Sequence, residues 1–165
     1  GPRAFTHVAS QHAGIIARSM LFRLPAKLDY AALPRVTYTD PELAQIGLTE
    51  VEARATHGVI QVLRRSLGEN DRLVAEDRAE GLIKLITTPR GRLLGASVVG
   101  PRAGDVAGML ALMIGRRLPL SALAGAVLPY PTLQEAAKRA AGDFYAPKLA
   151  SPMVRRLLGW LKYLP

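Results

Sequence analysis

The side chains that could do chemistry in this chain are few, and two of them lie close together. Tyr130 and Glu135 are five residues apart, with Pro131 between them, at the start of a segment that predicts a helix. A phenol and a carboxylate suit proton transfer, but such chemistry also needs a pocket and an orienting partner. The pair alone does not establish a small self-contained enzyme, which we keep as an alternative.

The remaining residue types exclude several kinds of site. The chain has no cysteine, so it contains no disulfide, no thiolate nucleophile and no cysteine-based zinc site. His7 and His12 are five residues apart, which puts them on diverging faces of a helix, and His57 lies in another segment. We therefore expect no metal site.

Composition and charge limit the class of protein. The 165 residues, 49% of them hydrophobic and 21% charged, are typical of one folded domain. We find no signal peptide and no apolar run long enough to span a membrane, so we expect a cytoplasmic protein. The net charge of +9 raises the question of nucleic acid. The basic residues stand in separated pairs, however, and only 5% of residues are aromatic, so stacking platforms are missing. We expect no nucleic-acid partner and keep a basic binding module as an alternative.

The first part of the chain predicts a helix, a linker and a strand. Residues 6–22 have an apolar stripe with Thr6 as a candidate N-cap, and a linker with two prolines follows over 23–34. Residues 35–39 are β-prone. The sequence Asp40-Pro41 then stops the strand, and its proline suits the first turn of a helix.

The middle of the chain predicts a sheet followed by helices. Thr49 and Glu52 have the capping-box spacing of a helix that Gly58 closes. Three β-like segments and a largely buried helix come next, and Ser121 and Thr132 are candidate caps of two further helices. The β-like segments are 59–67, 81–88 and 92–99, and the buried helix is 103–117. The last helix covers about 133–144. The prediction is an α+β fold, an antiparallel β-sheet with helices packed on one side.

Three stretches together resemble a known family. They are VTYTDPELAQIGLTE over 36–50, GASVVG over 95–100 and YPTLQE over 130–135. The chain resembles the C-terminal dimerisation domain of FAD-dependent pyridine nucleotide-disulfide oxidoreductases, which include dihydrolipoamide dehydrogenase, glutathione reductase and mercuric reductase. The resemblance implies a homodimer and an intact enzyme that passes electrons from NAD(P)H through FAD to a small acceptor. The flavin fingerprint G-x-G-x-x-G is absent, so we expect the chain by itself to hold no flavin and to be inactive.

The resemblance also implies roles for individual residues. The helix start at Phe5, Thr6 and His7 resembles the segment that meets the flavin ring, and a helix N-terminus suits the anionic end of a reduced flavin. Pro131 is the remaining residue implied to contact the cofactor. Tyr130 and Glu135 would be contributed to the partner subunit's site.

Tyr130 departs from the pattern of the thiol-reducing enzymes in this family. These enzymes carry a proton-shuttling histidine there, and a phenol with a pKa near ~10 is a poor base beside an imidazole near ~6.5. With a tyrosine in this region, the chain resembles the mercuric-reductase branch of the family. That branch has a C-terminal cysteine pair which this chain lacks, so mercury as a substrate is unsupported.

The resemblance and the composition suggest three parts of the chain. Residues 1–32 would be the last helix of the FAD-binding domain with its linker, 33–147 the dimerisation domain, and 148–165 an amphipathic tail. In the tail, Val154 and four leucines share one helical face, and Arg155, Arg156 and Lys162 lie largely on another. This pattern suits an interfacial helix and equally a helix docked on the body or on a second subunit. The three basic residues of 152–164 are few for stable lipid anchoring, so docking or fraying of the tail is favoured over membrane contact.

Overall fold

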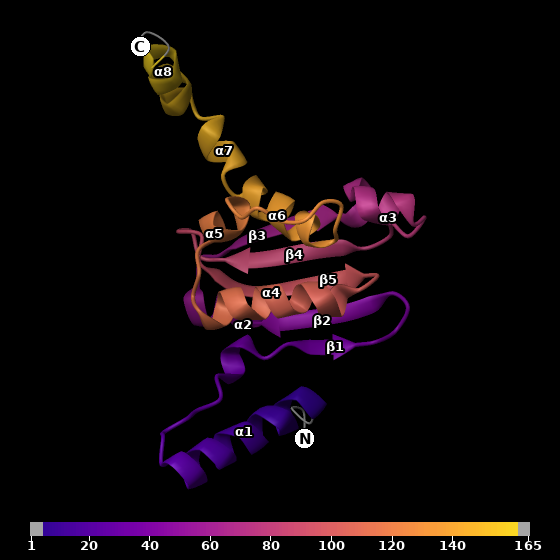
Figure 1. Cartoon of the computed structure of the whole chain (residues 1–165). Coiled ribbons are helices and arrows are strands. Elements are labelled where there is room, and N and C mark those ends of the chain that lie inside the picture. The colour runs from indigo at the N-terminus through magenta and orange to yellow at the C-terminus, as the bar shows by residue number, and fades with distance from the viewer. Residues whose placement is uncertain (1–4, 162–165) are drawn as a thin grey trace.

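The computed structural model describes residues 5–161, whose strands form a five-stranded antiparallel sheet (Figure 1). The strands lie in the order β1-β2-β5-β4-β3, so β1 and β3 are the edges. The strands are β1 (Arg35–Thr37), β2 (Glu42–Gly47), β3 (Gln61–Ser66), β4 (Leu82–Thr87) and β5 (Leu93–Gly100). The helices are α1 (Thr6–Phe22), α2 (Glu50–His57), α3 (Asp71–Ala75), α4 (Ala103–Gly115), α5 (Leu120–Ala124), α6 (Gln134–Asp143), α7 (Ala146–Leu149) and α8 (Pro152–Leu161), with 3-10 turns η1 (Tyr30–Ala32) and η2 (Leu67–Glu69).

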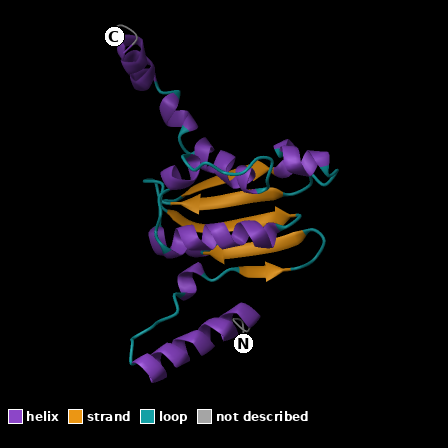
Figure 2. Ribbon diagram, in the orientation of Figure 1, coloured by secondary structure: helices purple, strands orange, loops and turns teal. Residues whose placement is uncertain are grey.

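One face of the sheet is covered by a layer made of α4, α5 and α6 (Figure 2). Ile46, Leu85 and Val98 point from the strands into this layer and are fully buried, as is Leu110 of α4. The buried face of α6 consists of alanines, which let the helix lie close to the strands: Ala136, Ala137, Ala140 and Ala141. The predicted α+β fold, with helices on one side of an antiparallel sheet, is confirmed.

The opposite face of the sheet is only partly covered. Helix α2 packs there through Ala53, which forms a small second core with Ile60, Ile86 and Leu94. Elsewhere on this face Leu43 and Leu82 remain partly exposed. The sheet therefore has one fully covered face and one face that is open over much of its area.

The predicted helix after Asp40-Pro41 is wrong, because this segment forms β2. The Asp40–Pro41 peptide bond is cis and lies in the turn between β1 and β2. In β2 the alternate residues Ala44 and Ile46 are buried, and the strand pairs with β5 along its whole length. Period-two burial and pairing on both sides outweigh a local preference for a helix start.

Two glycines permit the close crossing between β5 and the corner that joins β2 to α2. Gly47 has a φ of +64°, and a Cβ there would lie 2.4 Å from the carbonyl oxygen of Leu94. A Cβ on its register partner Gly95 would lie 1.9 Å from the carbonyl oxygen of Leu48. The amide of Leu48 donates to Leu94 at 3.0 Å across this crossing. Larger side chains at either glycine would push the two backbones apart.

The capping box predicted at α2 is confirmed. The hydroxyl of Thr49 accepts from the amide of Glu52 at 3.3 Å, and the amide of Thr49 donates to Oε2 of Glu52 at 2.8 Å. Gly58 ends the helix with its amide bonded to Arg54. Both ends of α2 were therefore predictable from short-range sequence alone.

Three other predicted caps are wrong. Thr6 lies inside the first turn of α1, whose N-cap residue is Phe5, and Ser121 lies inside α5. Thr132 precedes α6, but its hydroxyl donates to the carbonyl oxygen of Pro129 at 2.8 Å. A threonine or serine hydroxyl has several local backbone partners, and the surrounding loop decides which one it binds.

Candidate functional site

Tyr130 lies on the loop before α6 and is bonded to the first residue of α3. Its hydroxyl donates to Oδ2 of Asp71 at 3.1 Å, and its side chain is 67% exposed. The hydrogen bond to Asp71, followed by the negative charges of Asp71 and Glu135, raises the pKa of the Tyr130 phenol. The geometry therefore favours a protonated, solvent-facing phenol that can offer or share a proton but is a poor base.

Two side chains hold this loop in place against α3. The side-chain amide nitrogen of Asn70 donates to the carbonyl oxygen of Thr132 at 3.0 Å. The Oδ1 of the same side chain accepts from the backbone amide of Leu73 and so caps α3. Arg139 of α6 donates to the carbonyl oxygen of Glu69 at 3.0 Å and approaches Asp71 at 3.4 Å. Asp71 is therefore shared between a tyrosine and an arginine, which fixes its orientation.

Glu135, in the first turn of α6, has a buried carboxylate oxygen. Its Oε2 is inaccessible to solvent and has no hydrogen-bond partner in the part of the chain that the structure describes. Burying a carboxylate oxygen without a donor is unfavourable, so a group in this position calls for a donor from elsewhere. Tyr130 and Glu135 lie close enough for the charge of Glu135 to contribute to the raised pKa of Tyr130.

Pro131 lines a small pocket at the N-terminal end of α4. The pocket has a volume of about 280 Å³, and its wall includes Arg72, Arg102 and Thr132. Both arginines bind the carboxylate of Glu76, at 2.5 and 2.6 Å, so their charge is partly neutralised. The pocket thus offers a polar lining beside the Tyr130 loop.

The second group of predicted residues lies at the start of α1. The rings of Phe5 and His7 stack with centroids 5.3 Å apart, and Nε2 of His7 donates to the carbonyl oxygen of Pro34 at 3.0 Å. Thr6 is exposed. A neighbouring pocket of about 650 Å³ lies between α1 and the linker and is lined by His7, Val8 and Pro34, among others.

The two groups lie at opposite edges of the molecule. Helix α1 is beyond the edge strand β1, whereas α6 packs on β3 and β4 at the other edge (Figure 1). One copy of the chain therefore does not bring Tyr130 or Glu135 to the start of α1.

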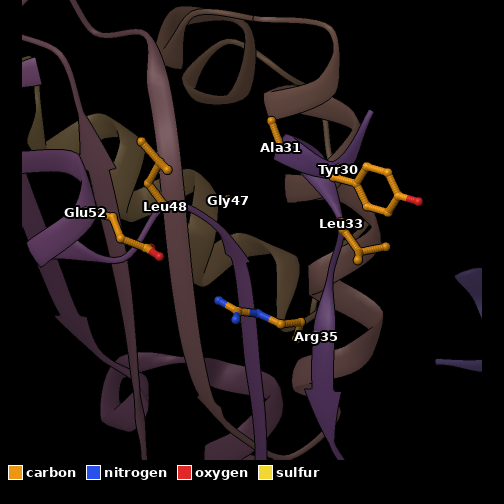
Figure 3. Close-up of a pocket in the computed structure, with 7 residues that line it drawn as sticks. All are labelled: Tyr30, Ala31, Leu33, Arg35, Gly47, Leu48 and Glu52. Carbon is orange, nitrogen blue, oxygen red and sulfur yellow. The ribbon is translucent and has the colours of Figure 1, made fainter. Parts of the chain in front are cut away.

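A further pocket, of about 370 Å³, was not predicted from the sequence (Figure 3). It lies between the η1–β1 segment and the corner before α2, and its polar lining includes Tyr30, Arg35 and Glu52. Hydrogen bonds from Thr49 lower the pKa of Glu52 and commit this carboxylate to the cap. No short-range signal could have found the pocket, because pairing of β1 with β2 brings its two walls together.

Metal binding and membrane spanning have no support in residues 5–161. This part of the chain contains no group of three or more metal-ligating side chains. It also contains no helix long and apolar enough to cross a bilayer. His7 and His12, which we judged a poor metal pair, bind Pro34 and the hydroxyl of Tyr30 instead.

The chain thus has an antiparallel sheet covered by helices on one face, with a Tyr-Pro-Thr loop beside the helical layer. This is the architecture of a class of subunit-interface domain. A family profile described as the pyridine nucleotide-disulphide oxidoreductase dimerisation domain matches residues 33–141. The chain belongs to this family.

Named relatives agree with this assignment. The chain is 36% identical over 143 residues to dihydrolipoyl dehydrogenase 3 of Haloarcula marismortui, covering 86% of this chain and 30% of that protein. It is 37% identical over 141 residues to a mercuric reductase of Streptomyces lividans, covering 85% of this chain and 30% of that protein. The chain thus spans less than a third of the length of these relatives.

Solved structures support the fold. Escherichia coli RclA, a flavoprotein disulfide reductase, matches with a TM-score of 0.78 at 22% identity, over 84% of this chain and 32% of that one. Mycobacterium tuberculosis LpdA matches with a TM-score of 0.77 at 21% identity, over 84% of this chain and 30% of that one.

Proposed function

We propose that this chain is the dimer-forming part of a flavoenzyme that transfers electrons from NAD(P)H through FAD to a small acceptor. Residues 1–32 would belong to the FAD-binding part, 33–147 would form the dimerisation domain and 148–165 a separate tail. The family assignment and the two kinds of relative support this proposal. The chain by itself would be inactive, because it lacks a dinucleotide-binding segment.

The apolar surface of α1 supports its assignment to a larger enzyme. Ile16, Met20, Leu21 and Phe22 are all more than half exposed. An isolated helix with so much exposed apolar surface needs a covering partner, which the rest of a longer chain would supply.

The start of α1 fits a limited contact with FAD. The first-turn amides of a helix have no partner within it, and the adjoining pocket at His7 is open. Phe5, Thr6 and His7 would contact the flavin from one copy of the chain and Pro131 from the second copy, and the flavin would supply the electron transfer when bound. The positive end of α1 would stabilise negative charge there.

The observation that carries the dimer proposal is the exposure of Leu112. This leucine is 60% exposed on α4, although Val106 and Leu110 of the same helix are buried. Val127, on the segment after α5, is 98% exposed. Asp105, Gly108 and Leu112 form an outward face of α4, and a second subunit lying on this face would cover the apolar side chain of Leu112.

Light scattering of the purified chain tests this proposal. We expect a dimer, and we expect Leu112→Glu to give a folded monomer, because an unpaired carboxylate at an apolar interface is costly. Val59→Glu is a matched control, since Val59 is 73% exposed on the turn after α2 and outside the helical layer. A monomer for the unchanged chain, or a Leu112→Glu variant that remains dimeric, would contradict the proposal.

Tyr130 would act in the partner subunit's site as a hydrogen-bond donor. In the single chain its hydroxyl donates to Asp71, so in the dimer it would exchange Asp71 for an acceptor of that site. Its exposure leaves it within reach, and its raised pKa favours the protonated form. Glu135 would contribute its carboxylate to the same site. In the intact enzyme, Tyr130→Phe would slow turnover without loss of flavin, whereas Tyr38→Phe, at another exposed tyrosine, would change neither.

A further inference from the structure

The last described helix, α8, stands away from the folded body (Figure 1). Its polar contacts are local: the guanidinium of Arg155 donates to the carbonyl oxygen of Ala150 at 2.9 Å, and the amide of Val154 donates to Ser151 at 3.4 Å. Met153 is 80% exposed and Trp160 is 75% exposed. Docking of the tail on the body, one of the arrangements considered from the sequence, is not observed in the described residues.

The helix presents an apolar side and a basic side. At about 100° per residue, Met153, Val154 and Trp160 fall within about 120° of one another, and Arg155 and Arg156 fall outside that arc. In the sequence, the leucines at 157, 158 and 161 share the apolar spacing. A short helix with a large aromatic on its apolar side, one arginine opposite and another at the boundary has the pattern of an interfacial helix.

The charge of this segment is of one sign. Asp143 is the last acidic residue of the chain, and four basic residues follow it: Lys148, Arg155, Arg156 and Lys162. The whole chain also carries a net charge of +9. A second copy of the same chain is a poor electrostatic complement for this tail, whereas an anionic lipid surface is a good one.

We propose that α8 binds reversibly in the surface of an anionic lipid bilayer. Its apolar side, with Met153 and Trp160, would lie at the boundary of the acyl chains, and its arginines would face the lipid phosphates. Four basic residues and one short apolar side provide a modest affinity, so the association is sensitive to salt and lipid charge.

Trp160 is the single tryptophan of the chain, so its fluorescence reports on α8 directly. The whole chain would be titrated with vesicles of equal parts phosphatidylcholine and phosphatidylglycerol, and with vesicles of phosphatidylcholine alone. We expect the anionic vesicles to move the emission to shorter wavelength and to shield Trp160 from acrylamide, and high salt to reverse both effects. Unchanged emission, or the same change on raising protein concentration without lipid, would overturn the proposal; the latter would place the helix on a second copy.

A pair of charge reversals separates the tail from the general basic character of the chain. Arg156→Glu and Arg18→Glu change the net charge equally, and both side chains are exposed. We expect Arg156→Glu to weaken vesicle binding by roughly tenfold or more and Arg18→Glu to weaken it much less. Equal weakening by the two variants would contradict a role for α8.

Discussion

The hydroxyl of Tyr130 donates a hydrogen bond to Oδ2 of Asp71 at 3.1 Å, which joins the loop before α6 to the first residue of α3. Asp71 also lies 3.4 Å from the guanidinium of Arg139. Oδ2 of Asp71 therefore accepts from the phenol and also lies beside the arginine cation. This arrangement favours the neutral form of Tyr130, because the phenolate would face a negative neighbour without a proton between them.

Asp71→Asn should lower the pKa of Tyr130 toward the ordinary value of a tyrosine. In the folded chain, the bond to Asp71 raises this pKa, so the interaction stabilises the protein below the ordinary tyrosine pKa and is lost as the pH rises further. The ultraviolet absorbance of phenolate, titrated in the chain and in Tyr130→Phe, isolates Tyr130 by difference. An unchanged titration in Asp71→Asn would show that the bond is not populated in solution.

Short-range patterns predicted the parts of the fold that depend on short-range contacts. The capping box of Thr49 and Glu52 spans three residues, and the β-like segments 81–88 and 92–99, which contain β4 and most of β5, are only three residues apart. The hydrogen-bond partner of Tyr130 could not be predicted in this way. Asp71 is 59 residues away, and only the packing of α3 beside α6 brings the two together.

The error at Asp40-Pro41 has a different cause. A proline after an aspartate is as compatible with a tight turn as with a helix start, and only neighbouring strands decide between them. Ala44 and Ile46 alternate with less buried residues over just six positions, which is a weak signal beside the helical propensities of Glu42, Leu43 and Gln45.

Gly95→Ala should destabilise the domain strongly, by at least about 2 kcal/mol. The added Cβ would lie 1.9 Å from the carbonyl oxygen of Leu48, and the atoms it meets belong to the backbone, which cannot rotate away. Urea unfolding followed by circular dichroism measures the change. Gly142→Ala is the matched control: Gly142 lies in α6 with no atom within 4 Å of the new methyl group. That substitution should be neutral or stabilising, since alanine is the better helix former; a similar loss in both would refute the crossing argument.

Asp143→Asn should loosen α6 from the edge of the sheet. One guanidinium nitrogen of Arg65 on β3 contacts both carboxylate oxygens of Asp143 at 3.0 Å, and the other contacts Glu69 at 2.6 Å. The hydrogen bond to Asp143 is the main reason that the pKa of Arg65 is raised. The pair is partly exposed, so we expect a loss of up to about 1 kcal/mol in unfolding free energy, with faster amide exchange in α6. Asp29→Asn, in the linker, should leave amide exchange in α6 unchanged.

Thr49→Ala should cost about 1 kcal/mol of unfolding free energy at neutral pH, because it removes the side-chain cap of α2. The hydrogen bonds from Thr49 lower the pKa of Glu52 below its ordinary 4.5, so the stabilisation from this carboxylate is present above that pH and is lost as the pH falls through the lowered value. The difference between the chain and the variant should therefore narrow in acid. Urea unfolding at neutral and at acidic pH measures both effects. Ser121→Ala, at a predicted cap that the structure does not use, should change the free energy by less than about 0.5 kcal/mol. If Ser121→Ala cost as much as Thr49→Ala, the capping box would not account for the loss.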